Sequence, residues 1–254
     1  MIQLIKGDCL VEMQNIADKS IDCIICDLPY GTTACKWDTV IPFEPLWAHY
    51  KRVIKDNGAI VLFGSQPFTS ALVMSNPKWF KYDWYWKKNR YTNFLNAKHQ
   101  PMRGIETISV FYCKKPTFNA IPFRDGYHQN FSNNEGKKME GNYGVHTKKS
   151  CTKPKKIKSA HDCLEFEVVH QQSKEYQGHS TQKPVPLLEY LIKTYTNEGE
   201  TVLDNTMGSG STGVAAKQLK RSFVGIEMDD KYFDIAVKRI NEAQPHVSLF
   251  SDCP

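Results

Sequence analysis

The chain has 254 residues, of which 41% are hydrophobic and 24% charged, a composition typical of a globular protein with one sizeable core. Its longest apolar runs, at 23–26 and 59–63, have the length of strands and are too short to span a membrane. The first residues lack the features of a secretion signal, so we expect a cytoplasmic protein.

The eight cysteines are scattered and form no disulfide framework. Cys23 and Cys26 have a metal-like spacing, but they lie inside the apolar run IDCIICD, and no second pair accompanies them. We therefore expect free thiols and no structural metal.

Strand-like and helix-like segments alternate along the chain, which predicts an α/β sheet with helices on both faces. The N-terminal half has predicted strands at 3–6, 21–26, 59–63 and 105–113, with helices after the first strand and at 43–55, the latter stopped by Asn57-Gly58. Alternation over 79–86 predicts a further strand with one buried face. The C-terminal part predicts helix 184–196, strand 201–203, helix 211–220, strand 223–226 and a last helix ending near Ile240.

The tetrapeptide Asp27-Leu28-Pro29-Tyr30 follows the apolar strand 21–26, and α/β sheets bind ligands at the carboxyl ends of their strands. These residue types suit the activation of an exocyclic base amine. Such an amine is a poor nucleophile because its lone pair is delocalised into the ring. A carboxylate and a carbonyl that accept its two hydrogens favour the tetrahedral nitrogen, while an aromatic ring stacks on the flipped base. Asp27, the carbonyl of Leu28 and Tyr30 could supply these functions, although such a tetrapeptide alone is often only a turn.

Two segments carry most of the positive charge. Residues 78–103 hold seven Lys or Arg and one acid, and residues 137–158 hold eight lysines and one acid, together more than the net charge of +6. The second segment falls in a polar stretch, 114–178, which is too long for an ordinary loop. Both segments suggest a polyanionic partner, and the alternative is that the lysines of 137–158 merely solvate a loop.

A glycine-rich loop, Gly208-Ser209-Gly210, joins the strand at 201–203 to the following helix and suits close approach to a ligand. The next strand ends in Glu227, nineteen residues after Gly208, where a carboxylate can bind a ribose diol. This pattern also fits a dinucleotide-binding site, and a purely structural turn is a third interpretation.

Further residues around these motifs resemble the family of DNA amino-methyltransferases in which the catalytic motif precedes the cofactor motif. His179-Ser180-Thr181-Gln182-Lys183-Pro184 resembles its His-x-Thr-Gln-Lys-Pro element, and Asp204-Asn205-Thr206-Met207 resembles the opening of its cofactor loop. Residues 93–98, 101–103, Glu106 and 110–112 resemble its Trp-Lys…Pro-Leu-Arg…Glu…Val-Phe-Tyr region. Two residues depart from the family pattern: Leu28 replaces proline, and Thr206 replaces a phenylalanine of the cofactor pocket.

The resemblance implies a seven-stranded, mostly parallel Rossmann-like sheet with one reversed strand, and S-adenosylmethionine as cofactor. It implies catalytic roles for Asp27, Leu28, Pro29 and Tyr30. The cofactor residues that it implies are Asp8, Cys9, His179, Thr181, Lys183, Pro184, Asp204, Asn205, Thr206, Met207, Gly208, Gly210 and Glu227. As partners it implies double-stranded DNA, and it allows a homodimer and a cognate restriction endonuclease.

In this interpretation 1–113 is the catalytic half, 114–178 a DNA target-recognition insertion, 179–245 the cofactor-binding half and 246–254 a tail. Within the family an acidic first residue in the tetrapeptide accompanies adenine N6, and serine usually accompanies cytosine N4, so Asp27 favours adenine. The alternatives are a cytosine-N4 enzyme, an enzyme acting on RNA or a protein amide, a nicotinamide dehydrogenase, and a non-catalytic DNA-binding module.

Overall fold

The computed structural model describes residues 1–33, 38–121, 138–141, 144–147, 160–178 and 181–246. It divides into two compact units, one formed by 1–119 with 162–254 and the other by 120–161. The smaller unit contains the antiparallel pair β6 (Lys138–Gly141) and β7 (Gly144–Thr147). His179 and most of the lysines of 137–158 lie outside the described residues.

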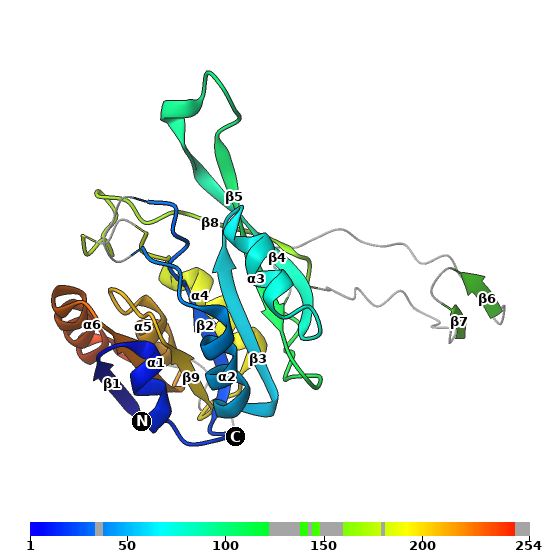
Figure 1. The fold of residues 1–254 in the computed structure, drawn as a ribbon, viewed down its shortest axis with the longest axis horizontal. Coiled ribbons are helices and arrows are strands. Elements are labelled where there is room, and N and C mark those ends of the chain that lie inside the picture. The colour runs from blue at the N-terminus through cyan, green and yellow to red at the C-terminus, as the bar shows by residue number, and fades with distance from the viewer. Residues whose placement is uncertain (34–37, 122–137, 142–143, 148–159, 179–180, 247–254) are drawn as a thin grey trace, which may run out of the picture. The chain divides into compact units, whose positions relative to one another are not determined.

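The larger unit is built on an eight-stranded sheet in the order β1-β10-β9-β2-β3-β5-β4-β8 (Figure 1). Its strands are β1 (Ile2–Lys6), β2 (Ile21–Cys26), β3 (Ile54–Gly64), β4 (Phe80–Thr92), β5 (Arg103–Phe111), β8 (Cys163–Phe166), β9 (Thr201–Asp204) and β10 (Ser222–Glu227). Only β5 runs antiparallel to its neighbours, which confirms the prediction of a mostly parallel sheet with one reversed strand.

The predicted count of seven strands is wrong, because β8 adds an eighth. This short strand comes from the polar stretch 114–178 and pairs in parallel with residues Tyr85 to Lys88 of β4. It satisfies backbone groups that would otherwise be open at the edge of β4. Its four residues, CLEF, are too few for a periodicity to stand out in a polar context.

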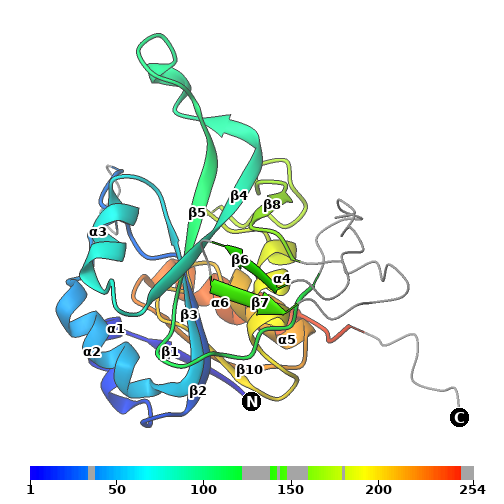
Figure 2. The same cartoon turned by 90° about the vertical axis from the view of Figure 1, so that its right-hand side faces the viewer.

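Helices cover both faces of this sheet (Figure 2). On one side lie α1 (Cys9–Glu12), α2 (Phe43–Val53) and α3 (Phe68–Ser75), and on the other α4 (Val185–Tyr195), α5 (Ser211–Gln218) and α6 (Asp230–Glu242). Two short 3-10 helices, η1 (Met13–Asn15) and η2 (Phe94–Asn96), complete the described elements. No helix in the described part of the chain is long and apolar enough to cross a membrane.

The boundary between α2 and β3 differs from the prediction. The helix ends at Val53, and Asn57-Gly58 lies inside β3 instead of stopping the helix. The register shifts between the pairs Ile21–Ile54 and Cys23–Ala59, so the strand is irregular at this point. A Cβ on Gly58 would lie 2.8 Å from the carbonyl oxygen of Asp22, so glycine permits this close approach of the two backbones.

The buried face of the central strands is apolar, as the sequence predicts. Cys23, Ile24, Ile25 and Cys26 are fully buried in β2, and both cysteines are free thiols. Burial raises the pKa of each of these two thiols well above its ordinary value. No group of side chains suited to a metal ion occurs among the described residues.

The strand order changes direction between β9 and β2. From β2 the chain builds the sheet towards β3 and β5, and from β9 it builds in the other direction to β10, which lies next to the N-terminal strand β1. In such sheets the connections leave on opposite faces at this point and open a crevice outside the carboxyl ends of the strands. Asp204 and Asp27 stand at these two carboxyl ends, so the fold itself brings the two predicted motifs together.

Candidate active site

A cavity of about 750 Å³ opens at this crevice. Residues from both halves of the sequence line it, which places the two predicted motifs in one site. The predicted residues among its lining are Asp8, Cys9, Asp27, Leu28, Pro29, Tyr30, Thr181, Lys183, Asp204, Asn205, Thr206, Met207, Gly208 and Glu227.

Two predicted residues do not line the cavity. Pro184 is the N-cap of α4 and is buried behind the lining. Gly210 is the N-cap of α5 with φ 80°, and a Cβ there would lie 2.9 Å from the Cβ of Ala236. Gly210 therefore allows α5 and α6 to pack closely, and does not itself face the cavity.

The first motif is held in a fixed conformation by its own side chains. The Tyr30 hydroxyl donates to Asp27 Oδ1 at 2.6 Å, and the Tyr30 ring stacks on Phe68 of α3 with centroids 5.0 Å apart. Leu28, which stands where the family has proline, is buried and joins the hydrophobic core. Packing of Leu28 thus fixes the loop where proline would do so through its ring.

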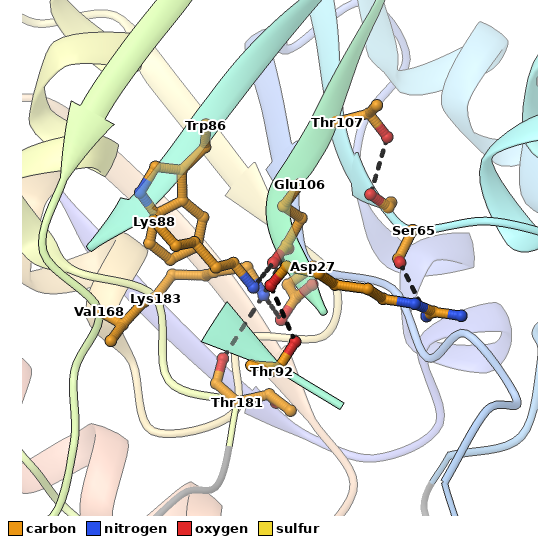
Figure 3. A network of polar contacts seen from close by, with 12 residues as sticks. Asp27, Ser65, Trp86, Lys88, Thr92, Glu106, Thr107, Val168, Thr181 and Lys183 are labelled. Atoms are coloured by element: carbon orange, nitrogen blue, oxygen red, sulfur yellow. Dashed lines mark hydrogen bonds and ion pairs between the residues drawn. The ribbon is translucent and has the colours of Figure 1, made fainter. Parts of the chain in front are cut away.

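Glu106 of β5 shares both partners of Asp27. Its Oε1 accepts from the Tyr30 hydroxyl at 3.1 Å and from Lys183 Nζ at 3.2 Å, and Lys183 also forms an ion pair with Asp27 Oδ2. Lys88 Nζ binds the other oxygen of Glu106 at 2.6 Å. Figure 3 shows these two lysines converging on the two carboxylates. The cluster therefore balances two negative against two positive charges.

Burial and the ion pairs together determine the direction in which each pKa in this cluster shifts. Desolvation raises the pKa of Asp27, although the Lys183 ammonium opposes the shift. Burial also opposes ionisation of Glu106, but Lys183 and Lys88 outweigh it and lower the pKa of that carboxyl. Desolvation disfavours the charge on Lys183, yet Asp27 and Glu106 raise its pKa. Of the two carboxyls, Asp27 is thus the one that protonates more readily.

The loop of the second motif is tied to the strand that follows it. Glu227 Oε2 accepts from the backbone N–H of Gly208 at 2.8 Å, and its Oε1 accepts from the N–H of Asp229 at 2.8 Å. Gly208 adopts φ 51°, a conformation that glycine reaches without strain. Burial raises the pKa of Glu227, and it raises the pKa of Asp204 to about 7.

Asn205 and Thr206 connect the two motifs. Asn205 Oδ1 accepts from Tyr50 Oη at 2.6 Å and from Cys26 Sγ at 2.9 Å, which fixes the orientation of the amide. Thr206 Oγ1 donates to the backbone carbonyl of Asp27 at 3.2 Å. Threonine in place of the family's phenylalanine thus supplies a hydrogen bond between the glycine-rich loop and the loop that carries Asp27.

The cavity suits a nucleoside that carries charged groups. Asn205 lines it together with Asp204, Thr206 and Met207 of the same loop. Asp8 lines the cavity while it caps α1 by accepting from Leu10 N at 2.8 Å. The carboxylates of Asp8 and Glu227 complement hydroxyl and amine donors, and S-adenosylmethionine presents both kinds of group.

The sequence prediction missed several residues of the site. Glu106 and Trp86 occupy paired positions on β5 and β4, and both line the cavity with Lys88. The sequence resemblance matched Glu106 to a glutamate of the family but assigned it no role in the site, and its burial becomes visible only after the strands are paired. Asp38 was also missed: it accepts from the backbone N–H groups of Gly31, Thr32 and Thr33 at 2.7–2.9 Å.

The site and the fold together define a class of enzyme. The family model described as DNA methylase, for N6 and N4 methyltransferases, matches residues 21–238 of the chain. The chain therefore belongs to this DNA amino-methyltransferase family, whose cofactor is S-adenosylmethionine.

Individual relatives match over nearly the whole chain. Type II methyltransferase M.HinfI of Haemophilus influenzae is 29% identical over 96% of this chain and 69% of its own length. Type II methyltransferase M.HpaI of Haemophilus parainfluenzae is 28% identical over 94% of this chain and 74% of its own length.

Solved structures share the fold. The complex of M1.HpyAVI with S-adenosylmethionine is similar with a TM-score of 0.65 at 27% identity, covering 95% of this chain and 100% of that one. The cytosine-N4-specific PvuII DNA methyltransferase has a TM-score of 0.68 over 94% of this chain and 86% of that one, and at 13% identity it shows the fold alone. These similarities confirm the predicted family, fold class and cofactor.

Replacing Glu227 with alanine should weaken S-adenosylmethionine binding by about 1.5–3 kcal/mol, the range for hydrogen bonds to a charged group. The carboxylate stands at the end of β10 against the glycine loop, where the variant loses a ligand acceptor and the support of Gly208. Calorimetry on the purified proteins measures the effect, with Glu242→Ala, an exposed glutamate of α6, as control. Wild-type affinity in Glu227→Ala, or tighter binding of NAD than of S-adenosylmethionine to the wild type, would refute this assignment.

Proposed function

We propose that this enzyme transfers a methyl group from S-adenosylmethionine to N6 of an adenine flipped out of duplex DNA. The observation that carries the proposal is the carboxylate of Asp27, which is 23% exposed and lines the cavity beside Tyr30. In the family an acidic residue at this position accompanies adenine, as the sequence resemblance implies. Cytosine N4 is the alternative target.

Asp27 and Leu28 would prepare the target amine. A carboxylate oxygen of Asp27 accepts one N–H and the carbonyl of Leu28 accepts the other, which favours the tetrahedral nitrogen with its lone pair free. Lys183 keeps Asp27 ionised, and Asp27 is then available to receive the proton that the product amine loses. The cofactor, when bound, supplies the methyl group.

Tyr30 would hold the flipped base. One face of its ring is covered by Phe68, and the other remains for stacking on an aromatic base. Its hydroxyl is anchored by Asp27 and Glu106, so the ring is fixed before the base arrives. Such preorganisation lowers the free energy that would otherwise be spent on ordering the side chain.

The cofactor would occupy the part of the cavity beside β1, β9 and β10. We assign the ribose hydroxyls to Glu227, the adenine amine to Asp8 and the methionine portion to Asn205 and Thr181, with Cys9, Asp204, Thr206, Met207 and Gly208 as walls. Lys183 stands between the two motifs, because its ammonium pairs with Asp27 and Glu106. His179 belongs to the same motif and remains a predicted contact.

We further propose that 114–178 recognises the DNA sequence. Its lysines would neutralise phosphates, so replacing four of them with alanine should weaken DNA binding and lower the salt slope by about 0.9 per lost contact. Fluorescence anisotropy over a salt series, beside calorimetry with the cofactor, measures this, and cofactor affinity should not change. The variant replaces Lys153, Lys155, Lys156 and Lys158.

The matched control removes the same charge elsewhere, from four exposed lysines on or next to the helices: Lys51, Lys220, Lys231 and Lys238. If both variants show the same loss of DNA affinity and of salt dependence, only the net charge of the protein matters for DNA binding. If the first variant binds DNA as the wild type does, the lysines of the insertion merely solvate it.

The product identifies the target atom. Purified enzyme incubated with unmethylated plasmid DNA and S-adenosylmethionine should yield N6-methyladenine when the DNA is digested and its nucleosides are measured by mass spectrometry. N4-methylcytosine as the main product would overturn the choice of adenine, and methylation of RNA in preference to duplex DNA would overturn the choice of substrate.

A further inference from the structure

Strands β4 and β5 extend beyond the sheet as a two-stranded ribbon, which stands out from the rest of its unit in both views (Figures 1 and 2). Thr92 pairs with Arg103, and residues 93–102 close the end of the ribbon around η2. Asn93 adopts φ 69° and its Oδ1 accepts from Asn96 Nδ2 at 2.8 Å. The tip is thus a hydrogen-bonded turn.

Large apolar side chains are displayed at this tip. Phe94 is 70% exposed and Leu95 82% exposed, in adjacent positions of η2. Tyr91 and Met102 flank them and are exposed as well. Neighbouring exposed apolar groups of this size indicate an interaction site.

The charge around the tip selects the partner. From Trp84 to Ile105 the ribbon carries Lys87, Lys88, Arg90, Lys98 and Arg103 and no acidic residue. A polyanion is attracted to such a surface, whereas an apolar protein partner would have to desolvate these cations. A two-stranded ribbon also has the dimensions to enter a groove of duplex DNA.

The ribbon is continuous with the active site. Lys88, Arg90, Thr92 and Arg103 line the cavity that holds Asp27. Phe94 follows Thr92 by two residues, so their Cα atoms are at most roughly 7 Å apart. Successive bases along a DNA strand are roughly 3.4 Å apart, so the tip lies within about two base steps of the cavity wall.

We infer that Phe94 and Leu95 form a wedge that enters the DNA duplex next to the target base and stabilises the helix once that base has moved into the cavity. Apolar side chains inserted between base steps offset the cost of unstacking. The exposed Arg90, Lys98 and Arg103 of the ribbon hold the phosphates on either side of the wedge, whereas Lys88 pairs with Glu106. This inference rests on the proposed function in that the base must leave the duplex to be methylated.

The test compares two duplexes that contain the sequence methylated by the wild type, as found by sequencing modified DNA. In one duplex the target base is paired, and in the other its partner is an abasic site, so the base leaves the helix easily. The Phe94→Ala/Leu95→Ala variant should lose at least ~10-fold in single-turnover methylation of the paired duplex, and recover to within ~3-fold of wild type on the abasic one. Met74→Ala, which removes an exposed methionine of α3, should match the wild type on both.

Three results would overturn the wedge. These are an equal loss of methylation rate on both duplexes, no loss of rate on either duplex, or a wild-type dimer in sedimentation that the variant does not form. The last result would mean that the tip contacts a second copy of the chain. Cofactor affinity measured by calorimetry should be unchanged in the variant, which shows that it is folded. If sequencing finds no DNA sequence that the wild type methylates, the proposed function itself fails, which distinguishes the two failures.

Discussion

Asp27→Ala should lower the single-turnover rate of DNA methylation by about 2.7–4 kcal/mol of barrier, or roughly 10²–10³-fold, the scale for losing one preorganised electrostatic group. The carboxylate matters most while the target nitrogen becomes tetrahedral and positive. Asp27→Asn keeps the shape of the side chain but stabilises that charge less, so it should also lose rate. Rapid-quench measurements at saturating cofactor and DNA give the rate directly.

Cofactor affinity should survive both substitutions, because Asp27 is assigned to the base. Asp234→Ala, an exposed aspartate of α6, controls for removal of a surface carboxylate and should turn over as the wild type does. Turnover of Asp27→Ala within a few-fold of wild type would show that this loop does not prepare the amine.

Lys183→Met should make methylation strongly dependent on pH. Lys183 opposes the rise that burial imposes on the pKa of Asp27, so its removal raises that pKa further. The reaction needs ionised Asp27, so the rate near neutral pH should fall and recover as the pH rises. A pH–rate profile should therefore show the acidic limb displaced to higher pH relative to wild type.

Stability of the Lys183→Met variant should change with pH in the opposite direction. A carboxyl whose pKa is higher folded than unfolded stabilises the fold below its unfolded pKa, and this contribution is lost as pH rises through the folded pKa. At pH 8 Glu106 keeps Lys88 as a partner, whereas Asp27 has lost its ion pair with Lys183, and we expect the free energy of unfolding in urea to be about 3–5 kcal/mol lower than in wild type. Lys193→Met, which removes a half-exposed lysine of α4, should alter neither profile. An unshifted acidic limb would show that Lys183 does not control Asp27.

The sheet could be predicted because its strands carry local signals. The apolar runs of β2 and β3 and the regular apolar face of α4 each define an element without knowledge of its neighbours. Elements whose formation depends on tertiary contacts were missed or displaced. β8 forms because β4 offers an open edge, and the start of β3 at Ile54 depends on pairing with Ile21.

The residues of the candidate site likewise differ in whether local sequence signals could predict them. Asp27 and Glu227 could be predicted because each follows directly on a strand, where α/β sheets bind their ligands. Glu106 lies within β5, and the pairing of β5 with β3 and of β3 with β2 brings it to Tyr30. The pairing of Lys183 with Asp27 joins positions 156 residues apart, so no local pattern could indicate it.

Sequencing of modified bases in cells tests the central claim most directly, because it reports the base, the modified atom and the sequence context together. DNA from methylation-deficient cells expressing the wild type should carry N6-methyladenine in one recurring sequence, and DNA from matched cells expressing Asp27→Ala should carry none. Modified cytosine in the wild-type sample, or N6-methyladenine at wild-type levels with Asp27→Ala, would contradict adenine methylation through Asp27.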